Sequence, residues 1–209
     1  GRDASGLVNI EFIDSFGKST KRSWEVVKRK YKVQRIEGVR QDRITPPKSV
    51  SARIGEETRQ VVNARALRST SEAFLSGFDL PLVGPVTGVY GSARIYNGIP
   101  KSPHYGIDYA APNGSEVKAP CSGIVTLAHD NMYFSGGTLI IDHGMGLSST
   151  FLHLSSISVI VGEQIKRGQV IAAVGATGRA TGPHLDWRMN WHDERIDPQL
   201  VLLALPAKE

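Results

Sequence analysis

Five side chains that can bind a metal or transfer a proton stand out in this sequence by their types and spacing. They are His104, Asp108, His153, His184 and Asp186. Hydrolysis of an amide at neutral pH needs a nucleophilic water, an electrophile for the carbonyl oxygen and a proton source for the leaving nitrogen. One divalent cation held by three protein ligands supplies the first two, because it acidifies water and polarises the carbonyl. The five residues therefore include enough ligands and proton carriers for metal-dependent hydrolysis.

Two of the five residues lie in a segment with strand character, residues 184–190. His184 and Asp186 stand two apart there, so both side chains are expected on one face, while Leu185 and Trp187 face the core. His153 ends an apolar strand, Phe151-Leu152-His153-Leu154. The pattern predicts two polar groups on one patch of a sheet, and a third residue at the end of another strand.

The remaining pair, His104 and Asp108, stands four apart. Gly106 and the following Ala-Ala-Pro favour a loop that enters a strand over a helix. Convergence of this pair with the others is a tertiary inference. Structural roles are open for each residue: His104 and His184 can tether loops by hydrogen bonds, Asp108 can cap a turn, and His153 can cover a strand end.

The ordered set H-x-x-x-D, a histidine about fifty residues later, and G-P-H-x-[H/D]-W resembles the lysostaphin-like (LytM, M23-type) zinc metallopeptidases, which cut peptide bonds in bacterial peptidoglycan. The resemblance covers about residues 88–198 and includes Asp142-His143-Gly144 and Gly168-Gln169. It implies one Zn²⁺ bound by His104, Asp108 and Asp186. It also implies that His153 and His184 orient the water, accept its proton and stabilise the tetrahedral intermediate.

The sequence departs from the family pattern at Asp186, where a second histidine of H-x-H is usual. Zinc accepts a carboxylate oxygen at about the distance of an imidazole nitrogen. A His-Asp-Asp set cancels both charges of the cation, so the metal is expected to be a weaker Lewis acid, and Mn²⁺ or another hard ion competes better. The departure leaves two interpretations: an active endopeptidase, or a catalytically degenerate relative that binds peptidoglycan or regulates a partner hydrolase.

Two residues before the first motif are further, weaker candidates. Relatives carry a residue near Tyr96 that contacts the scissile group, and Arg94 is close to it in sequence. His143 is expected in a turn, and His129 and His192 on the surface.

The elements that must position these residues are mainly β. Short segments with strand character, separated by Gly and Asp turns, predict a C-terminal antiparallel β sandwich or partly open barrel over residues 81–209, and the resemblance implies that this domain is of the LytM type. They are residues 123–128, 137–142, 148–153, 170–174 and 184–190. Before them, residues 1–80 form a smaller, basic region with short strands at 6–13 and before Val27. A helix is expected there over about 52–67, with Ser51 as its N-cap and Ile54, Val61, Ala64 and Leu67 on its apolar face.

Composition and charge limit the function classes. The chain has 209 residues, 40% of them apolar, and a single cysteine, Cys121, so an intrachain disulfide is excluded. Residues 1–70 carry sixteen Lys or Arg against eight Asp or Glu, and the rest carries nine against twelve. Such a basic segment attracts polyanions, but without a nucleic-acid module the least supported partner is nucleic acid. Residues 1–80 could instead act as a wall- or membrane-binding adaptor, or cover the active-site groove.

The expected location follows from the resemblance. The sequence holds no run of about 20 apolar residues, so no transmembrane segment is expected. Gly1-Arg2-Asp3 is not typical of a signal peptide. A peptidoglycan substrate implies an exported protein of the periplasm or cell envelope, and groove-lining loops such as residues 130–137 are expected to select the bond.

Overall fold

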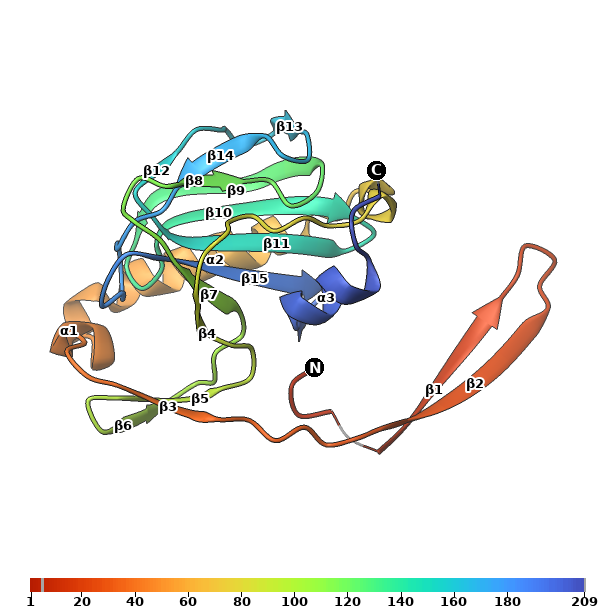
Figure 1. Cartoon of the computed structure of the whole chain (residues 1–209), viewed down its shortest axis with the longest axis horizontal. Helices are drawn as coiled ribbons and strands as arrows, with labels where there is room; N and C mark the ends of the chain where they lie inside the picture. The colour runs from red at the N-terminus through yellow and green to blue at the C-terminus, as the bar shows by residue number, and fades with distance from the viewer. Residues whose placement is uncertain (5, 209) are drawn as a thin grey trace.

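The computed structural model describes residues 1–4 and 6–208, and its centre is one large antiparallel sheet (Figure 1). In spatial order its strands are β13 (Gln164–Ile165), β9 (Gly123–Met132), β10 (Gly136–Gly144), β11 (Leu147–Leu154), β15 (His184–Trp191), β7 (Ile107–Ala110) and β4 (Val86–Gly88), and β16 (Glu194–Ile196) pairs with β15. A three-stranded sheet of β12 (Ser156–Ile157), β14 (Val170–Ala173) and β8 (Glu116–Lys118) lies beside it. The expected mainly β, antiparallel fold is confirmed, and the large sheet is not closed into a barrel.

The period-two pattern of the strands explains the core. In β15, Leu185, Trp187 and Met189 alternate with polar residues and are fully buried. They pack with apolar residues of β10, β11 and β14, such as Leu139 and Phe151. Each large apolar side chain removed from water in this way contributes about 1.5–3 kcal/mol. The expected orientation of Leu185 and Trp187 toward the core is confirmed.

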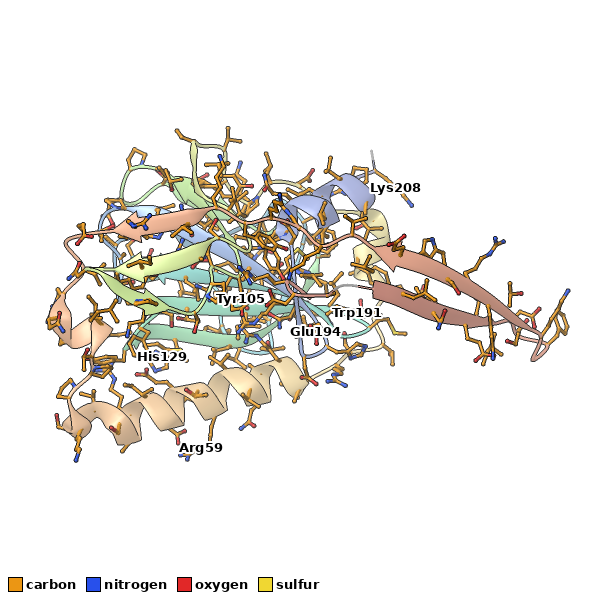
Figure 2. The ribbon with its side chains drawn as sticks, turned by 90° about the horizontal axis from the view of Figure 1, so that it is seen from below. Arg59, Tyr105, His129, Trp191, Glu194 and Lys208 are labelled. Atoms are coloured by element: carbon orange, nitrogen blue, oxygen red, sulfur yellow. The ribbon has the colours of Figure 1, made fainter. Side chains whose placement is uncertain are left out.

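The opposite face of the sheet is shared between a helix and the candidate site. Helix α2 (Ser51–Ala66) packs Ala64 against Leu127, Met132 and Ile140 of the neighbouring strands, and it runs along this face with Arg59 pointing outward (Figure 2). Further along, this face carries polar residues of β15. The helix therefore covers one part of the face and leaves the other part open.

The helix expected over about 52–67 is α2, but two details differ. Ser51 is not its N-cap, because the 3-10 turn η1 (Lys48–Val50) runs directly into the helix and Ser51 already has helical dihedral angles, φ −60° and ψ −40°. Leu67 lies beyond the helix and is exposed. The buried face instead includes Glu57, whose carboxylate accepts a hydrogen bond from the Tyr133 backbone N–H at 2.7 Å.

The N-terminal residues form two further sheets. β1 (Gly6–Ile13) and β2 (Ser19–Val26) form a hairpin that projects from the body of the molecule (Figure 1). β3 (Val33–Ile36) pairs in parallel with β5 (Ala93–Tyr96), and β6 (Ile99–Lys101) completes that sheet. This pairing joins residues on both sides of position 80, so the two parts are in direct contact. The division of the chain near residue 80 stays a prediction.

The remaining elements are short. Helices α1 (Gln41–Ile44) and α3 (Pro198–Ala204) and the 3-10 turn η2 (Ala73–Ser76) connect or follow the sheets. Asp197 caps α3 by accepting a hydrogen bond from Gln199 N. Cys121 is buried, and its Sγ lies 3.3 Å from the carbonyl oxygen of Ala73. Among residues 1–4 and 6–208, no helix has the length and apolar character that a bilayer crossing requires.

Candidate metal centre

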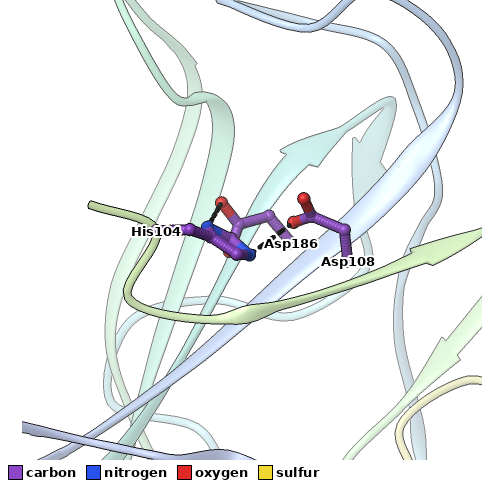
Figure 3. Close-up of side chains that lie close together, drawn as sticks. All are labelled: His104, Asp108 and Asp186. Carbon is purple, nitrogen blue, oxygen red and sulfur yellow. Dashed lines mark ion pairs between the residues drawn. The ribbon is translucent and has the colours of Figure 1, made fainter. Parts of the chain in front are cut away.

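Three of the five sequence-predicted residues meet on the open part of the sheet face. Strands β15 and β7 are neighbours, and their register places Asp186 directly opposite Asp108. His104 lies in the loop before β7, where its backbone N–H donates to Ser92 O at 2.8 Å. One ligand atom from each of the three side chains lies within 4.8 Å of the other two (Figure 3). The structure therefore brings His104, Asp108 and Asp186 together.

Gly106 permits this approach. A Cβ added at Gly106 would lie 2.5 Å from Asp186 Oδ1 and 2.6 Å from Arg188 Cγ. Both distances are below normal van der Waals contact, so any larger residue would push the loop away from the sheet. The glycine noted in the sequence thus serves a close approach of the loop that carries His104.

Each carboxylate of the cluster is paired with an arginine: Asp186 with Arg188, which the sequence analysis missed, and Asp108 with Arg94, which it gave only as a weak candidate. Arg188, two residues after Asp186 on the same face of β15, donates from Nε to Oδ1 at 2.9 Å and from Nη2 to Oδ2 at 2.5 Å. Arg94 of β5 donates to Asp108 Oδ2. Burial opposes ionisation of both carboxylates, but the nearby guanidinium groups and His104 outweigh it and hold the pKa of Asp108 and of Asp186 below the usual value.

The buried atoms that remain without partners match a cation site. His104 is 1% exposed. Its Nε2 lies 3.1 Å from Asp108 Oδ1 and its Nδ1 4.0 Å from Asp186 Oδ2. Neither nitrogen, nor Asp108 Oδ1, has a partner at hydrogen-bond geometry within the described part of the chain. Buried polar atoms of this kind usually have a partner. One imidazole and two carboxylates are donors that zinc accepts, and a carboxylate oxygen that accepts from arginine keeps a second lone pair. The residues fit a divalent cation.

His153 and His184 lie next to this cluster as a pair of imidazoles with fixed tautomers. Their ring centroids are 4.9 Å apart. Nδ1 of His153 lies 2.8 Å from Thr177 O, and Nδ1 of His184 lies 2.8 Å from Gly182 O. A carbonyl oxygen only accepts, so each Nδ1 carries a proton, and in the neutral form of either ring Nε2 keeps its lone pair. Burial lowers the pKa of His153 to about 4, so this imidazole is neutral at pH 7 and can accept a proton.

The backbone at His153 is strained in a way that aims its side chain. His153 has φ +64°, in the left-handed region that a histidine seldom adopts. The register between β10 and β11 shifts at the same place, between the pairs of Gly137 and Leu139. Irregularities of this kind redirect one side chain out of the strand pattern and cost about 1–3 kcal/mol. The strand therefore departs from regular geometry at a histidine that lies beside the cluster.

The other histidines lie outside the cluster. His143 is not in a turn as expected: β10 continues through Gly144, and His143 is fully buried. Its Nδ1 donates to Ser122 O at 2.9 Å, and its Nε2 accepts from Ser149 Oγ at 2.8 Å, so both ring nitrogens are satisfied. His192 is exposed, and His129 is partly exposed on β9.

These buried neutral histidines predict acid sensitivity of the metal-free fold. Burial lowers the pKa of His143 and of His153 from 6.5 to about 4. Between these values the unfolded chain binds more protons than the folded chain, so the free energy of unfolding should fall as pH is lowered from about 6.5 to 4. Thermal unfolding with a chelator across this range measures the effect. His143→Gln, which cannot be protonated, should give a shallower pH slope, and an equal slope in both proteins would contradict the assignment.

Asp108 and Asp186 of the cluster line a cleft of about 550 Å³, together with His153 and His184. One wall comes from β3 and the residues that follow it, and Phe134 and Ser135 line the cleft from the expected 130–137 loop. The two weaker candidates, Tyr96 and Arg94, also line the cleft. Arg179 and Arg188 were missed, although Arg188 continues the spacing of two from His184 and Asp186. The covering role of residues 1–80 stays a prediction.

Comparisons with known proteins identify relatives of this chain. Residues 102–198 match peptidase family M23. A crystal structure of a putative M23 peptidase from Pseudomonas aeruginosa is 32% identical and has a TM-score of 0.73, covering 95% of this chain and 74% of that one. A zinc-containing peptidase from Vibrio cholerae is 32% identical with a TM-score of 0.54, over 58% of this chain and 39% of that one.

A curated relative has a more specific name. The peptidoglycan DD-endopeptidase ShyB of Vibrio cholerae is 34% identical over 145 residues, 69% of this chain and 31% of the relative. Across eight curated relatives that it matches, the chain spans 20% to 31% of their length.

Proposed function

Since the chain belongs to peptidase family M23, we propose that it is a metal-dependent endopeptidase that hydrolyses peptide bonds in bacterial peptidoglycan. The observation that carries the proposal is the cluster of His104, Asp108 and Asp186 within 4.8 Å, with the unpaired ring nitrogens of His104. A relative named as a peptidoglycan DD-endopeptidase supports the substrate. A substrate in the wall places the protein in the periplasm or cell envelope.

The proposed roles follow from the atoms that each residue presents. His104, Asp108 and Asp186 would hold the cation, with zinc as the first candidate and Mn²⁺ as an alternative. When bound, a divalent cation supplies a Lewis acid for the scissile carbonyl and makes water more acidic. His153 accepts the proton of the attacking water at Nε2, because its Nδ1 proton is held by Thr177 O. His184, held in the same way by Gly182 O, presents its Nε2 beside it to orient the water.

Arg188 changes the charge expected for the site. The sequence alone predicts a His-Asp-Asp set with one more negative charge than His-Asp-His. The contact of Arg188 with both oxygens of Asp186 adds one positive charge, so the pair is neutral, like the histidine that it would replace. A neutral pair in the third position supports a cation that retains its Lewis acidity.

The same arginines favour a second candidate function. Asp186 and Asp108 are each already paired with a guanidinium group, whose positive charge repels a cation at the same carboxylate. A protein in which these ion pairs persist would be a catalytically degenerate relative that binds peptidoglycan or regulates a partner hydrolase. The two candidates differ in whether peptide bonds are cut.

Digestion of purified peptidoglycan sacculi separates the candidates. We expect the protein with Zn²⁺ or Mn²⁺ to release soluble muropeptides with new amino termini, detectable by mass spectrometry. A chelator should stop the release, and added metal should restore it. Binding to sacculi without release under any divalent metal would instead support the degenerate relative and overturn the endopeptidase proposal.

A further inference from the structure

Arg179 is a cation that the proposed chemistry does not use. It lies in the connection between β14 and β15, where its backbone N–H donates to Phe134 O at 2.7 Å. Its guanidinium carbon is 5.0 Å from the ring centroid of Tyr96 and 4.9 Å from that of Phe134. Within the described part of the chain, its side chain has no hydrogen bond and no carboxylate partner. The two rings thus hold an unpaired guanidinium group at the cleft.

The charges around the cleft are unequal. Its lining includes four arginines but only two acidic residues: Arg35, Arg94, Arg179 and Arg188, with Asp108 and Asp186. Arg94 forms an ion pair with Asp108, and Arg188 forms one with Asp186. Arg35 and Arg179 therefore have no acidic partner among the residues that line the cleft. A divalent cation at the cluster would increase this positive excess. The cleft as a whole therefore favours a negatively charged ligand.

The surroundings of Arg179 are unfavourable for its charge in the free protein. Burial lowers the pKa of Arg179, and the like charges of Arg188 and Arg94 lower it further, while Tyr96 and Asp186 offset part of this shift. The aromatic rings offset part of this cost. An anion placed against the guanidinium group would remove the imbalance, and the planar fork of arginine matches a carboxylate through two parallel hydrogen bonds.

We propose that Arg179 binds a free carboxylate of the peptide substrate and that this contact selects carboxylate-bearing peptides over amidated ones. The inference rests on the proposed peptidase function, which supplies a peptide in the same cleft. Arg35, which also lines the cleft, adds to the positive field. A peptide offers such groups at two kinds of position, its C-terminus and the residues within it, and the experiment distinguishes them.

The test measures binding without cleavage. Four stem pentapeptides are titrated into the full chain in the presence of a chelator: the free acid, the C-terminal carboxamide, the peptide with every internal carboxylate amidated, and the fully amidated peptide. For the wild-type protein, amidation at one of the two kinds of position should weaken binding at least about tenfold, as for loss of a hydrogen bond between charged groups. The carboxylate whose amidation has this effect is the one that Arg179 contacts.

Variants then assign the effect to Arg179. Arg179→Gln should bind the free acid at least about tenfold more weakly and no longer distinguish it from the amide. Arg179→Lys should retain part of the preference. Arg59→Gln is the matched control, because Arg59 lies exposed on α2, away from the cleft, and pairs with Glu56 (Figure 2). This control should keep the wild-type preference.

Several results would overturn the inference. They are equal binding of all four peptides by the wild type, no binding of any peptide, or an unchanged preference in Arg179→Gln. Displacement of the peptide by inorganic phosphate at equal concentration would overturn the choice of a carboxylate ligand. Binding is measured without metal and does not depend on catalysis. A protein that prefers the free acid but releases no muropeptides would therefore contradict only the peptidase proposal. If the protein cleaves sacculi but binds the free acid and the amidated peptides equally well, only the role of Arg179 is contradicted.

Discussion

Replacing His104 by leucine should abolish metal binding and peptidase activity while leaving the fold intact. The imidazole is buried and makes no hydrogen bond of regular geometry among the described residues, but its Nε2 lies 3.1 Å from Asp108 Oδ1, so its removal takes one electrostatic partner from that carboxylate while Arg94 remains. If the cation contributes about 4 kcal/mol to transition-state stabilisation, muropeptide release should fall about 1,000-fold. Metal content should fall from near one per chain to a trace.

Thermal unfolding with and without zinc gives a second, independent readout. Zinc at 100 times its Kd should stabilise the wild type by about 2.7 kcal/mol and His104→Leu not at all. The metal-free His104→Leu protein should still unfold cooperatively, at or below the temperature of the metal-free wild type. His129→Leu is the control, because His129 lies on β9 outside the cluster and is expected to respond to zinc as the wild type does. Zinc stabilisation that survives in His104→Leu would remove this residue from the ligand set.

Replacing His153 by asparagine should reduce hydrolysis about 100- to 10,000-fold, the range for loss of a general base. Asparagine tolerates the left-handed backbone at φ +64°, and its amide can still donate to Thr177 O. The variant should therefore bind zinc and unfold near the wild-type temperature. Initial rates of muropeptide release at saturating zinc provide the measurement.

His192→Asn is a closely matched control for that substitution. His192 is also a histidine with positive φ, +51°, but it is exposed and lies outside the cleft. The same chemical change there should leave the rate unchanged. A full rate in His153→Asn would show that His153 serves the fold and not the reaction.

Much of the fold was predictable from local pattern. Alternating residues in 184–190 and apolar runs such as 137–142 predicted strands that the structure confirms as β15 and β10. The helix expected over 52–67 was also found. Two predicted details were wrong because they depend on neighbouring segments. Ser51 is not the N-cap, since a 3-10 turn precedes it, and His143 is buried in a strand, since β10 continues past Asp142.

The candidate site was predictable only in part. Spacing placed His184 and Asp186 on one face, because side chains alternate along any strand. The arginines beside the carboxylates were not predictable in the same way. Arg94 reaches Asp108 across two different sheets, and Arg179 is held by rings from two distant segments. Contacts between such distant segments leave no periodic pattern in the sequence from which they could be predicted.

By itself, the sequence determined which chemical groups are present and which of them share a strand face, since both follow from residue type and backbone period. Only the tertiary structure decided that Asp108 lies opposite Asp186, because strand register depends on the whole sheet. It also decided the charge of the site. Arg94 and Arg188 convert two carboxylates into ion pairs, and Arg179 adds an unpaired cation, through contacts that exist only once the chain has folded.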